Sequence, residues 1–350
     1  MDGVKGYFFR MAEKRDDQSV LRLLADNPAM GADVPITLDC SPSFFESTRP
    51  LGADAGTIVA ESDDGRIVGL GALTARNAYI DGVPRSLGYL GGLRIDPEFR
   101  KTRMLWDGYR FLGEIVADSG FDALFTTIMA GNSSATRILE SGRFGLPVYA
   151  PTGTYATRIF PALPTRPVES SRDLAFSRAT RDEMPEILDF LNANGKKKNF
   201  FPVLSSKDFD DGGMFSDLAP EDFIVARDRA AIAGTLALWD QSKTRRYVAA
   251  APSPAAKSGE PLDIRFASLV SVRENDPLIL REIVSAGIAA AAETGADFVV
   301  VGSDKRDAFP DMPWAAPPII LDSNVYSVSW NGAEPDFDTS RLFHLDPGTL

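Results

Sequence analysis

The chain has 350 residues, of which 44% are hydrophobic and 25% charged, so its composition is ordinary for a globular protein and its length suffices for two domain cores. Its formal net charge of -12 argues against DNA as a partner, because nonspecific affinity for nucleic acid comes mainly from clustered lysine and arginine. No apolar run approaches the roughly 20 residues that cross a bilayer, and residues 1–17 lack the apolar core of a signal peptide, so we expect a cytoplasmic protein without a membrane partner.

One cysteine and one histidine leave most metal and nucleophile chemistry without its usual residues. Cys40 alone forms no intrachain disulfide, and a nucleophilic role would need a base that the sequence does not identify. His344 alone excludes a His-rich metal site, and a serine triad would have to use this one imidazole. We therefore expect a protein that works without a metal.

Hydrophobic periodicity predicts alternating strands and helices in residues 1–160. Turns at Asp64-Gly65 and Asp81-Gly82 divide residues 57–95 into three antiparallel strands. Apolar positions at helical spacing predict a further helix across residues 105–116, which Gly120 ends. The other strands are expected at residues 5–12, at 123–130 and, as a pair, at 145–160. The other helices are expected at 16–27 and 134–142, the second with Asn132 or Ser133 as its N-cap.

The same order of elements recurs in the second half of the chain, after a proline-rich linker at residues 161–173. The predicted fold class is therefore α+β, with two tandem domains, residues 1–160 and 174–350, each a mostly antiparallel mixed sheet flanked by helices. A long loop at residues 192–221 is expected to cover a cleft. Strands are expected at 174–180, 222–240 (a hairpin), 265–272, 297–304 and 319–330, and helices at 181–194 and 276–295.

Residues 94–105, RIDPEFRKTRML, place a strand, a proline and a basic turn directly before a helix. The first N–H groups of a helix have no intrahelical partner, and together with the helix dipole they favour an anion. Arg100, Lys101 and Arg103 put three positive charges there, which an anionic partner would relieve. The stretch therefore predicts an anion site.

This stretch resembles the phosphate-binding motif of the GCN5-related N-acetyltransferases, the GNAT family. In that family a strand ending in hydrophobic-x-Pro-x-x-Arg leads to a glycine-rich turn whose N–H groups hold the pyrophosphate of coenzyme A. Ile95, Pro97 and Arg100 match the pattern in register, and Arg103 and Leu105 occupy the two glycine places. Glycine lets the backbone approach a ligand closely, so these two side chains change the turn.

A later segment, residues 132–144, resembles the family's N-x-x-A-x-x-x-Y-x-x-x-G-F. Asn132, Ala135 and Gly142 match, and Leu139 stands where many members have a tyrosine that protonates the thiolate of coenzyme A. The resemblance covers residues 7–160. It implies an acyl-CoA-dependent N-acyltransferase, usually an N-acetyltransferase, that binds acetyl-CoA or another acyl-CoA. The cofactor contacts that it implies are Leu93, Arg94, Ile95, Arg100, Lys101, Thr102, Arg103, Met104, Leu105 and Asn132.

No catalytic acid or base is evident from the motifs. Glu61 and Tyr89 are candidates for the base, because they lie on or beside the strands that lead to the turn. Tyr149 and Tyr155 are candidates for the acid, because the resemblance places the late strands beside the cleft. Each of the four also has an ordinary role at the surface or in the core, and buried tyrosines usually serve packing.

The second half departs further from the pattern. Asp276 is well placed to cap its long helix, so a carboxylate would occupy the anion position, and we assign this half to shaping the acceptor cleft. The expected acceptor is a small-molecule or peptide amine. Two alternatives stay open: a non-catalytic module that binds acyl-CoA or a partner, which the departures at Arg103, Leu105 and Leu139 favour, and a Fem-like aminoacyl transferase, against which the acidic charge argues.

Overall fold

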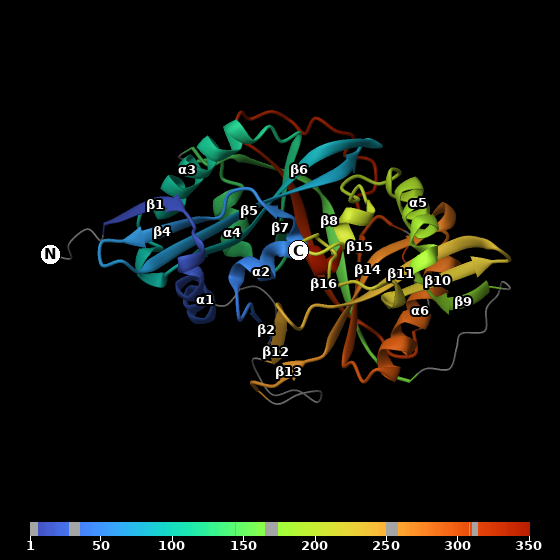
Figure 1. The fold of residues 1–350 in the computed structure, drawn as a ribbon. Coiled ribbons are helices and arrows are strands. Elements are labelled where there is room, and N and C mark those ends of the chain that lie inside the picture. Colours follow the sequence, from blue (N-terminus) through green and yellow to red (C-terminus); the bar gives the residue numbers. More distant parts are fainter. Residues whose placement is uncertain are drawn as a thin grey trace.

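The computed structural model describes residues 6–27, 36–143, 145–164, 174–249, 258–307, 309 and 314–350. Within them, helices flank one 13-stranded, mostly antiparallel sheet, which confirms the α+β class (Figure 1). Strands from residues 7–161 and from residues 174–329 belong to this one sheet, and we call these two parts of the chain the first and the second unit. The expected domain boundary lies at residues 161–173, of which 165–173 are outside the described residues.

The first unit contains the strands β1 (Tyr7–Met11), β3 (Ala53–Asp54), β4 (Ile58–Ser62), β5 (Ile67–Ile80), β6 (Val83–Ile95), β7 (Ala123–Met129) and β8 (Val148–Pro161). Its helices are α1 (Asp17–Asp26), α2 (Phe44–Thr48), α3 (Met104–Ser119) and α4 (Ser133–Leu139). The expected turns are present, with Gly65, Asp81 and Gly82 all at positive φ, and Gly120 ends α3 in the left-handed conformation.

The second unit contains β9 (Leu174–Arg178), β10 (Phe223–Asp228), β11 (Ala231–Asp240), β14 (Ile264–Val272), β15 (Phe298–Asp304) and β16 (Ile319–Ser329), with α5 (Met184–Gly195) and α6 (Pro277–Glu293). A small separate sheet joins β2 (Ile36–Asp39) to β12 (Arg246–Ala249) and β13 (Pro261–Leu262). Across it, Arg246 and Asp39 form an ion pair of 2.6 Å. This sheet therefore links segments far apart in the sequence.

The two units exchange strands at the centre of the sheet. Strand β16 lies between β7 and β8, antiparallel to both, and β8 pairs on its other edge with β15. The prediction of two strands at residues 145–160 is wrong, because β8 is one strand of 14 residues. Its Pro151 and Gly153 flank a shift in the register with β16.

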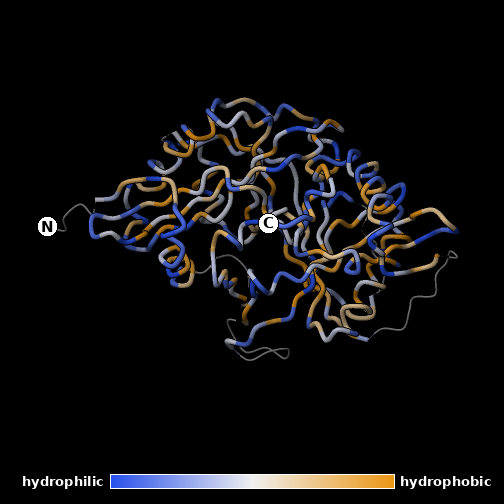
Figure 2. Tube along the Cα trace, viewed as in Figure 1, coloured by the Kyte–Doolittle hydropathy of each residue, from blue (hydrophilic) through white to orange (hydrophobic). Residues whose placement is uncertain are grey.

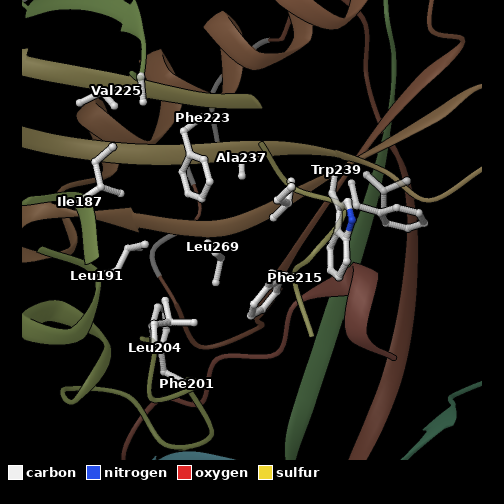
Figure 3. Packing of buried hydrophobic residues seen from close by; sticks show 14 of the residues in the cluster. Ile187, Leu191, Phe201, Leu204, Phe215, Phe223, Val225, Ala237, Trp239 and Leu269 are labelled. Carbon is white, nitrogen blue, oxygen red and sulfur yellow. The ribbon is translucent and has the colours of Figure 1, made fainter. Parts of the chain in front are cut away.

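Orange, hydrophobic segments run through the strands of the interior, whereas blue, hydrophilic segments are frequent in the outer loops (Figure 2). In the second unit, Phe223, Phe215 and Trp239 are fully buried in one cluster together with Leu191 of α5 (Figure 3). Burying a large apolar side chain stabilises a fold by about 1.5–3 kcal/mol. These contacts fix α5 and the segment that carries Phe215 against strands β10 and β11 of the shared sheet.

Candidate functional site

The candidate site lies where β6 and β7 separate. The two strands pair in parallel only between residues 87–89 and 123–125. Beyond Tyr89, strand β6 carries a bulge, with Gly92 at φ +67° and a register shift against β5. Residues with a side chain rarely adopt this backbone conformation, so glycine at residue 92 allows the bulge.

A cavity of about 270 Å³ occupies this split and continues beneath α3. Its walls come from β1, β4, β5, β6, β7, β8, α3 and α4, and most of its lining is apolar. The cavity brings together six of the ten predicted cofactor residues, Leu93, Arg94, Ile95, Met104, Leu105 and Asn132, and two of the four predicted catalytic residues, Tyr89 and Tyr149.

The basic turn before α3 is held by its own side chains. Thr102 accepts a hydrogen bond at Oγ1 from the Met104 N–H, at 3.2 Å. Arg100 donates to the Ile95 carbonyl and to Asn27 Oδ1, both at 3.1 Å, so its guanidinium ties the turn to the end of α1. The structure gives this side chain a structural role, and its contact with a cofactor stays a prediction.

Two of the three cations of the turn, Lys101 and Arg103, have exposed side chains at the start of α3. Neither lines the cavity, and Thr102 and Arg100 do not line it either. Arg94, which does line it, donates from Nε to the Asn27 carbonyl at 3.0 Å. The turn is therefore a positively charged rim above an apolar cavity.

Helix α4 closes another side of the cavity. Asn132 accepts a hydrogen bond at Oδ1 from the Ala135 N–H at 3.1 Å, which confirms the expected N-cap. Ala135 and Leu139, one turn apart on α4, both line the cavity. Leu139 is buried there, at the position where the resemblance implies a tyrosine.

Two buried tyrosines meet in the cavity wall. Tyr109 of α3 and Tyr149 of β8 share a hydrogen bond of 2.5 Å between their hydroxyl groups. Burial raises the pKa of Tyr109 to about 12 and raises the pKa of Tyr149 well above its usual value, so both hydroxyls stay protonated at neutral pH. The third tyrosine of the wall, Tyr89, contacts the Thr127 hydroxyl at 3.3 Å.

The other two predicted catalytic residues lie away from the cavity. Glu61 accepts a hydrogen bond of 2.8 Å from Arg10, which also binds Asp16 beside α1. Tyr155 is fully buried on β8, where its ring covers Gly302 of β15, and its hydroxyl has no partner among the described residues. Neither residue lines the cavity.

Sequence reasoning missed the floor of the cavity. Gly69 and Gly71 of β5 and Gly108 of α3 lie where the sheet faces α3, and all three line the cavity. A Cβ at Gly69 would lie 3.1 Å from the Met104 sulfur, and one at Gly108 would lie 3.1 Å from the Phe9 ring. The alternation of glycine at residues 69 and 71 was the available signal, because glycine in a strand often marks a close approach.

The described residues contain no group of three or more His, Cys, Asp or Glu side chains that could hold a metal ion. Among the same residues, no helix is long and apolar enough to cross a membrane.

Comparisons with known proteins agree with this architecture. No family model matches the chain, and no curated protein matches it in sequence. Solved structures do match. The N-myristoyltransferase of Saccharomyces cerevisiae, crystallised with bound myristoyl-CoA, aligns with a TM-score of 0.64 at 11% identity, over 98% of this chain and 89% of that one.

Two GNAT structures align equally well. A GCN5-related N-acetyltransferase from Sphaerobacter thermophilus has a TM-score of 0.60 at 14% identity, over 98% of both chains. A GCN5-related glucosamine N-acetyltransferase region of a fungal multi-domain GH3 β-N-acetylglucosaminidase has a TM-score of 0.63 at 13% identity, over 93% of this chain and 38% of that one. At these identities the likeness concerns the fold, and the chain has the GNAT-like fold that these N-acyltransferases share.

Proposed function

We propose that the protein is an acyl-CoA-dependent N-acyltransferase whose cofactor lies in the split between β6 and β7. The observation that carries the proposal is the cavity of about 270 Å³ at that split, below the positively charged start of α3. The arm of coenzyme A would lie along residues 93–95 and pass Asn132, with its pyrophosphate at Lys101, Arg103 and the first N–H groups of the helix. The fold shared with N-acyltransferases supports this assignment.

The reaction would be a direct transfer. The acceptor amine attacks the thioester carbonyl, a C–N bond forms, and the C–S bond breaks to release the thiolate of coenzyme A. A backbone N–H of residues 93–95 would stabilise the negative charge that develops on the carbonyl oxygen. The amine loses one proton to water. Of the two predicted candidates for the base, Glu61 binds Arg10 instead, and Tyr89 lines the cavity but burial raises its pKa, so its hydroxyl is protonated at neutral pH and cannot take the proton.

The thiolate needs a proton, and Tyr149 is the donor that we propose. Leu139 has no acidic hydrogen, whereas the Tyr149 hydroxyl lines the same cavity and is held by Tyr109. The Tyr149 hydroxyl is protonated at neutral pH, as a proton donor must be, and burial, which raises its pKa, makes it a weaker acid than an exposed phenol. Positioned proton transfer contributes typically about 10²–10⁴-fold to a rate.

The cavity also supports an acyl group longer than acetyl. Beyond the split it continues beneath α3, between Gly69, Gly71 and Gly108 and the side chains of Phe9 and Ile58. An acetyl group would end at the split and leave this apolar extension unfilled. Burial of an acyl chain in this extension would contribute about 0.8 kcal/mol of binding free energy for each methylene.

Binding of coenzyme A by isothermal titration calorimetry tests the cofactor site. The double variant Lys101→Glu/Arg103→Glu reverses the charges at the start of α3, and Arg110→Glu on the same helix is the matched control, because its side chain is 73% exposed and pairs only with Asp107 among the described residues. We expect the double variant to weaken binding by about tenfold and the control to leave it within about twofold. Equal affinities in all three proteins would contradict the site.

A second candidate, an acyl-CoA-binding module without turnover, is favoured by Leu139, which fills the place of the family's acid. Release of free thiol from acetyl-CoA and octanoyl-CoA, measured with a panel of polyamines, amino sugars and peptides, separates the two. Amine-dependent thiol release supports the enzyme. Saturable binding of coenzyme A with no release in the presence of any amine supports the module.

A further inference from the structure

The second unit contains a cavity at the place that corresponds to the candidate site. Strands β14 and β15 pair in parallel over residues 264–267 and 298–301 and then separate, as β6 and β7 do. Strand β14 also carries a bulge, with Leu269 at φ +51° and a register shift against β11. The split holds a cavity of about 260 Å³, close to the volume of the first.

Two carboxylates distinguish this second cavity from the first. Asp276 caps α6 by accepting from the Leu278 N–H at 2.9 Å, so the anion position at the start of this helix is filled. Asp346 accepts from the Leu269 N–H and from the Ser268 hydroxyl, both at 2.8 Å, so the amide of the bulge is also occupied. The second cavity therefore offers neither a diphosphate site nor an amide for a thioester oxygen.

The polar groups of the cavity wall are mostly paired, with one exception. Lys198 and Asp307 form an ion pair of 2.6 Å, and Asn275 also binds the Asp307 carboxylate. His344 lines the cavity, its ring lies against Phe201, and its buried Nε2 has no hydrogen-bond partner among the described residues. Burial beside Lys198 lowers the pKa of His344 to about 3, so the imidazole is neutral and can donate or accept one hydrogen bond.

The rest of the lining is largely apolar, with Val270, Leu280, Val301 and Leu345 among its side chains. Where parallel strands separate, the facing edges expose backbone N–H and C=O groups, which an extended chain with amides can bind. The two lysines of the cavity, Lys197 and Lys198, bind Asn194 Oδ1 and Asp307, and Glu274 adds a negative charge to the lining. The cavity therefore suits an extended ligand that forms amide hydrogen bonds better than it suits a phosphate.

We propose that the cavity between β14 and β15 binds a phosphate-free, amide-bearing chain of the chemical class of pantetheine, which would lie beside His344. The choice of this class rests on the proposed function of the first site, because the two splits correspond. The existence of the second site does not depend on that function. The ligand would bind without reacting, since Asp346 occupies the amide of the bulge.

Because His344 is the single histidine of the chain, selective ¹⁵N-histidine labelling gives a reporter inside the cavity. Pantetheine is the probe, added at millimolar concentration to the full chain without a histidine tag. We expect a saturable shift of the His344 Nε2 resonance with pantetheine and no shift with coenzyme A. A resonance that pantetheine leaves unchanged, or that coenzyme A moves equally, would overturn the proposal.

Variants locate the response. Leu280→Phe and Ser271→Phe each place a ring in the second cavity, and Ala135→Phe places one in the first. The two second-cavity variants should abolish the shift while circular dichroism shows an intact fold, and Ala135→Phe should preserve it. Loss of the shift in Ala135→Phe alone would show that pantetheine acts from the first cavity and would overturn the proposal.

The second site and the proposed function can fail separately. Failure of coenzyme A to bind the first cavity, with pantetheine still moving His344, would refute the proposed function alone.

Discussion

A larger side chain in place of Gly71 narrows the floor of the first cavity. It should weaken the binding of a long acyl chain more than that of an acetyl group. A Cβ at Gly71 would lie 3.4 Å from Ile58 Cγ1, which is ordinary contact, and its φ is not in the left-handed region. Gly71→Val is therefore compatible with β5, where valine is a better strand former than glycine. We expect no loss of thermal stability.

The magnitude follows from the volume that the new side chain takes. Valine adds three carbon atoms between Ile58 and the cavity, so it displaces about three methylenes of an acyl chain. At about 0.8 kcal/mol for each methylene, the substitution removes about 2.4 kcal/mol of binding free energy, which lowers the affinity about 50-fold. An acetyl group does not reach the floor, so its binding should change by less than about twofold.

The assay is calorimetric titration with acetyl-CoA and octanoyl-CoA in the absence of an amine. Asn77→Val is the matched control, because residue 77 is an exposed position of β5 that does not line the cavity. The reasoning is refuted if Gly71→Val weakens both ligands equally, or if octanoyl-CoA binds the variant as tightly as the wild type. Either result would place the acyl chain outside the space beneath α3.

Further predictions concern the tyrosine pair, the histidine and the α4 cap. Tyr109→Phe or Tyr149→Phe alone leaves one buried hydroxyl unpaired and should lower the free energy of unfolding by about 1–3 kcal/mol, whereas the double variant should cost less than the sum, as denaturant unfolding will show. If Tyr149 protonates the thiolate, Tyr149→Phe should lower kcat by at least about tenfold with little change in KM. The pKa of His344 is lowered in the folded state, so the unfolded chain binds a proton that the folded one does not. Stability should therefore fall by about 1.4 kcal/mol per pH unit as the pH drops from about 6 towards 3, and His344→Phe should remove that contribution. Asn132→Ala should cost about 1 kcal/mol in thermal unfolding, because α4 loses its cap.

The sequence was sufficient for features with local physical causes. The turns at residues 64–65 and 81–82, the Asn132 and Asp276 caps and the end of α3 at Gly120 each depend on residues adjacent in the chain, and each is present. The resemblance to GNAT proteins rested on such local motifs, and the fold agrees with it.

The sequence was insufficient for features that depend on long-range contacts. Nothing local shows that β16, more than 150 residues after β8, would insert beside it, or that residues 148–161 would pair with it as one strand rather than two. The role of Arg100 depends on Asn27, 73 positions earlier. Likewise, Tyr109 meets Tyr149 only because α3 packs over β8 near the cavity.

Of the four predicted catalytic residues, two line the cavity and two do not, again because of long-range contacts. Tyr89 of β6 and Tyr149 of β8 both line the cavity, whereas Glu61 of β4 binds Arg10. Tyr155 shares β8 with Tyr149, yet it lies farther along the strand, opposite Asp304 of β15. Position in the chain placed all four on suitable strands, but the face and depth of each depended on the assembled sheet.

The most direct test of the central claim is calorimetric titration of coenzyme A into the wild type, Ala135→Phe and Ile138→Phe. Both substitutions add a ring to α4, but Ala135 lines the cavity and Ile138 is 44% exposed and does not. If the arm of coenzyme A lies between β6 and β7, Ala135→Phe abolishes binding and Ile138→Phe leaves it intact. Wild-type affinity in Ala135→Phe, or no binding in the wild type at millimolar concentration, would contradict the account.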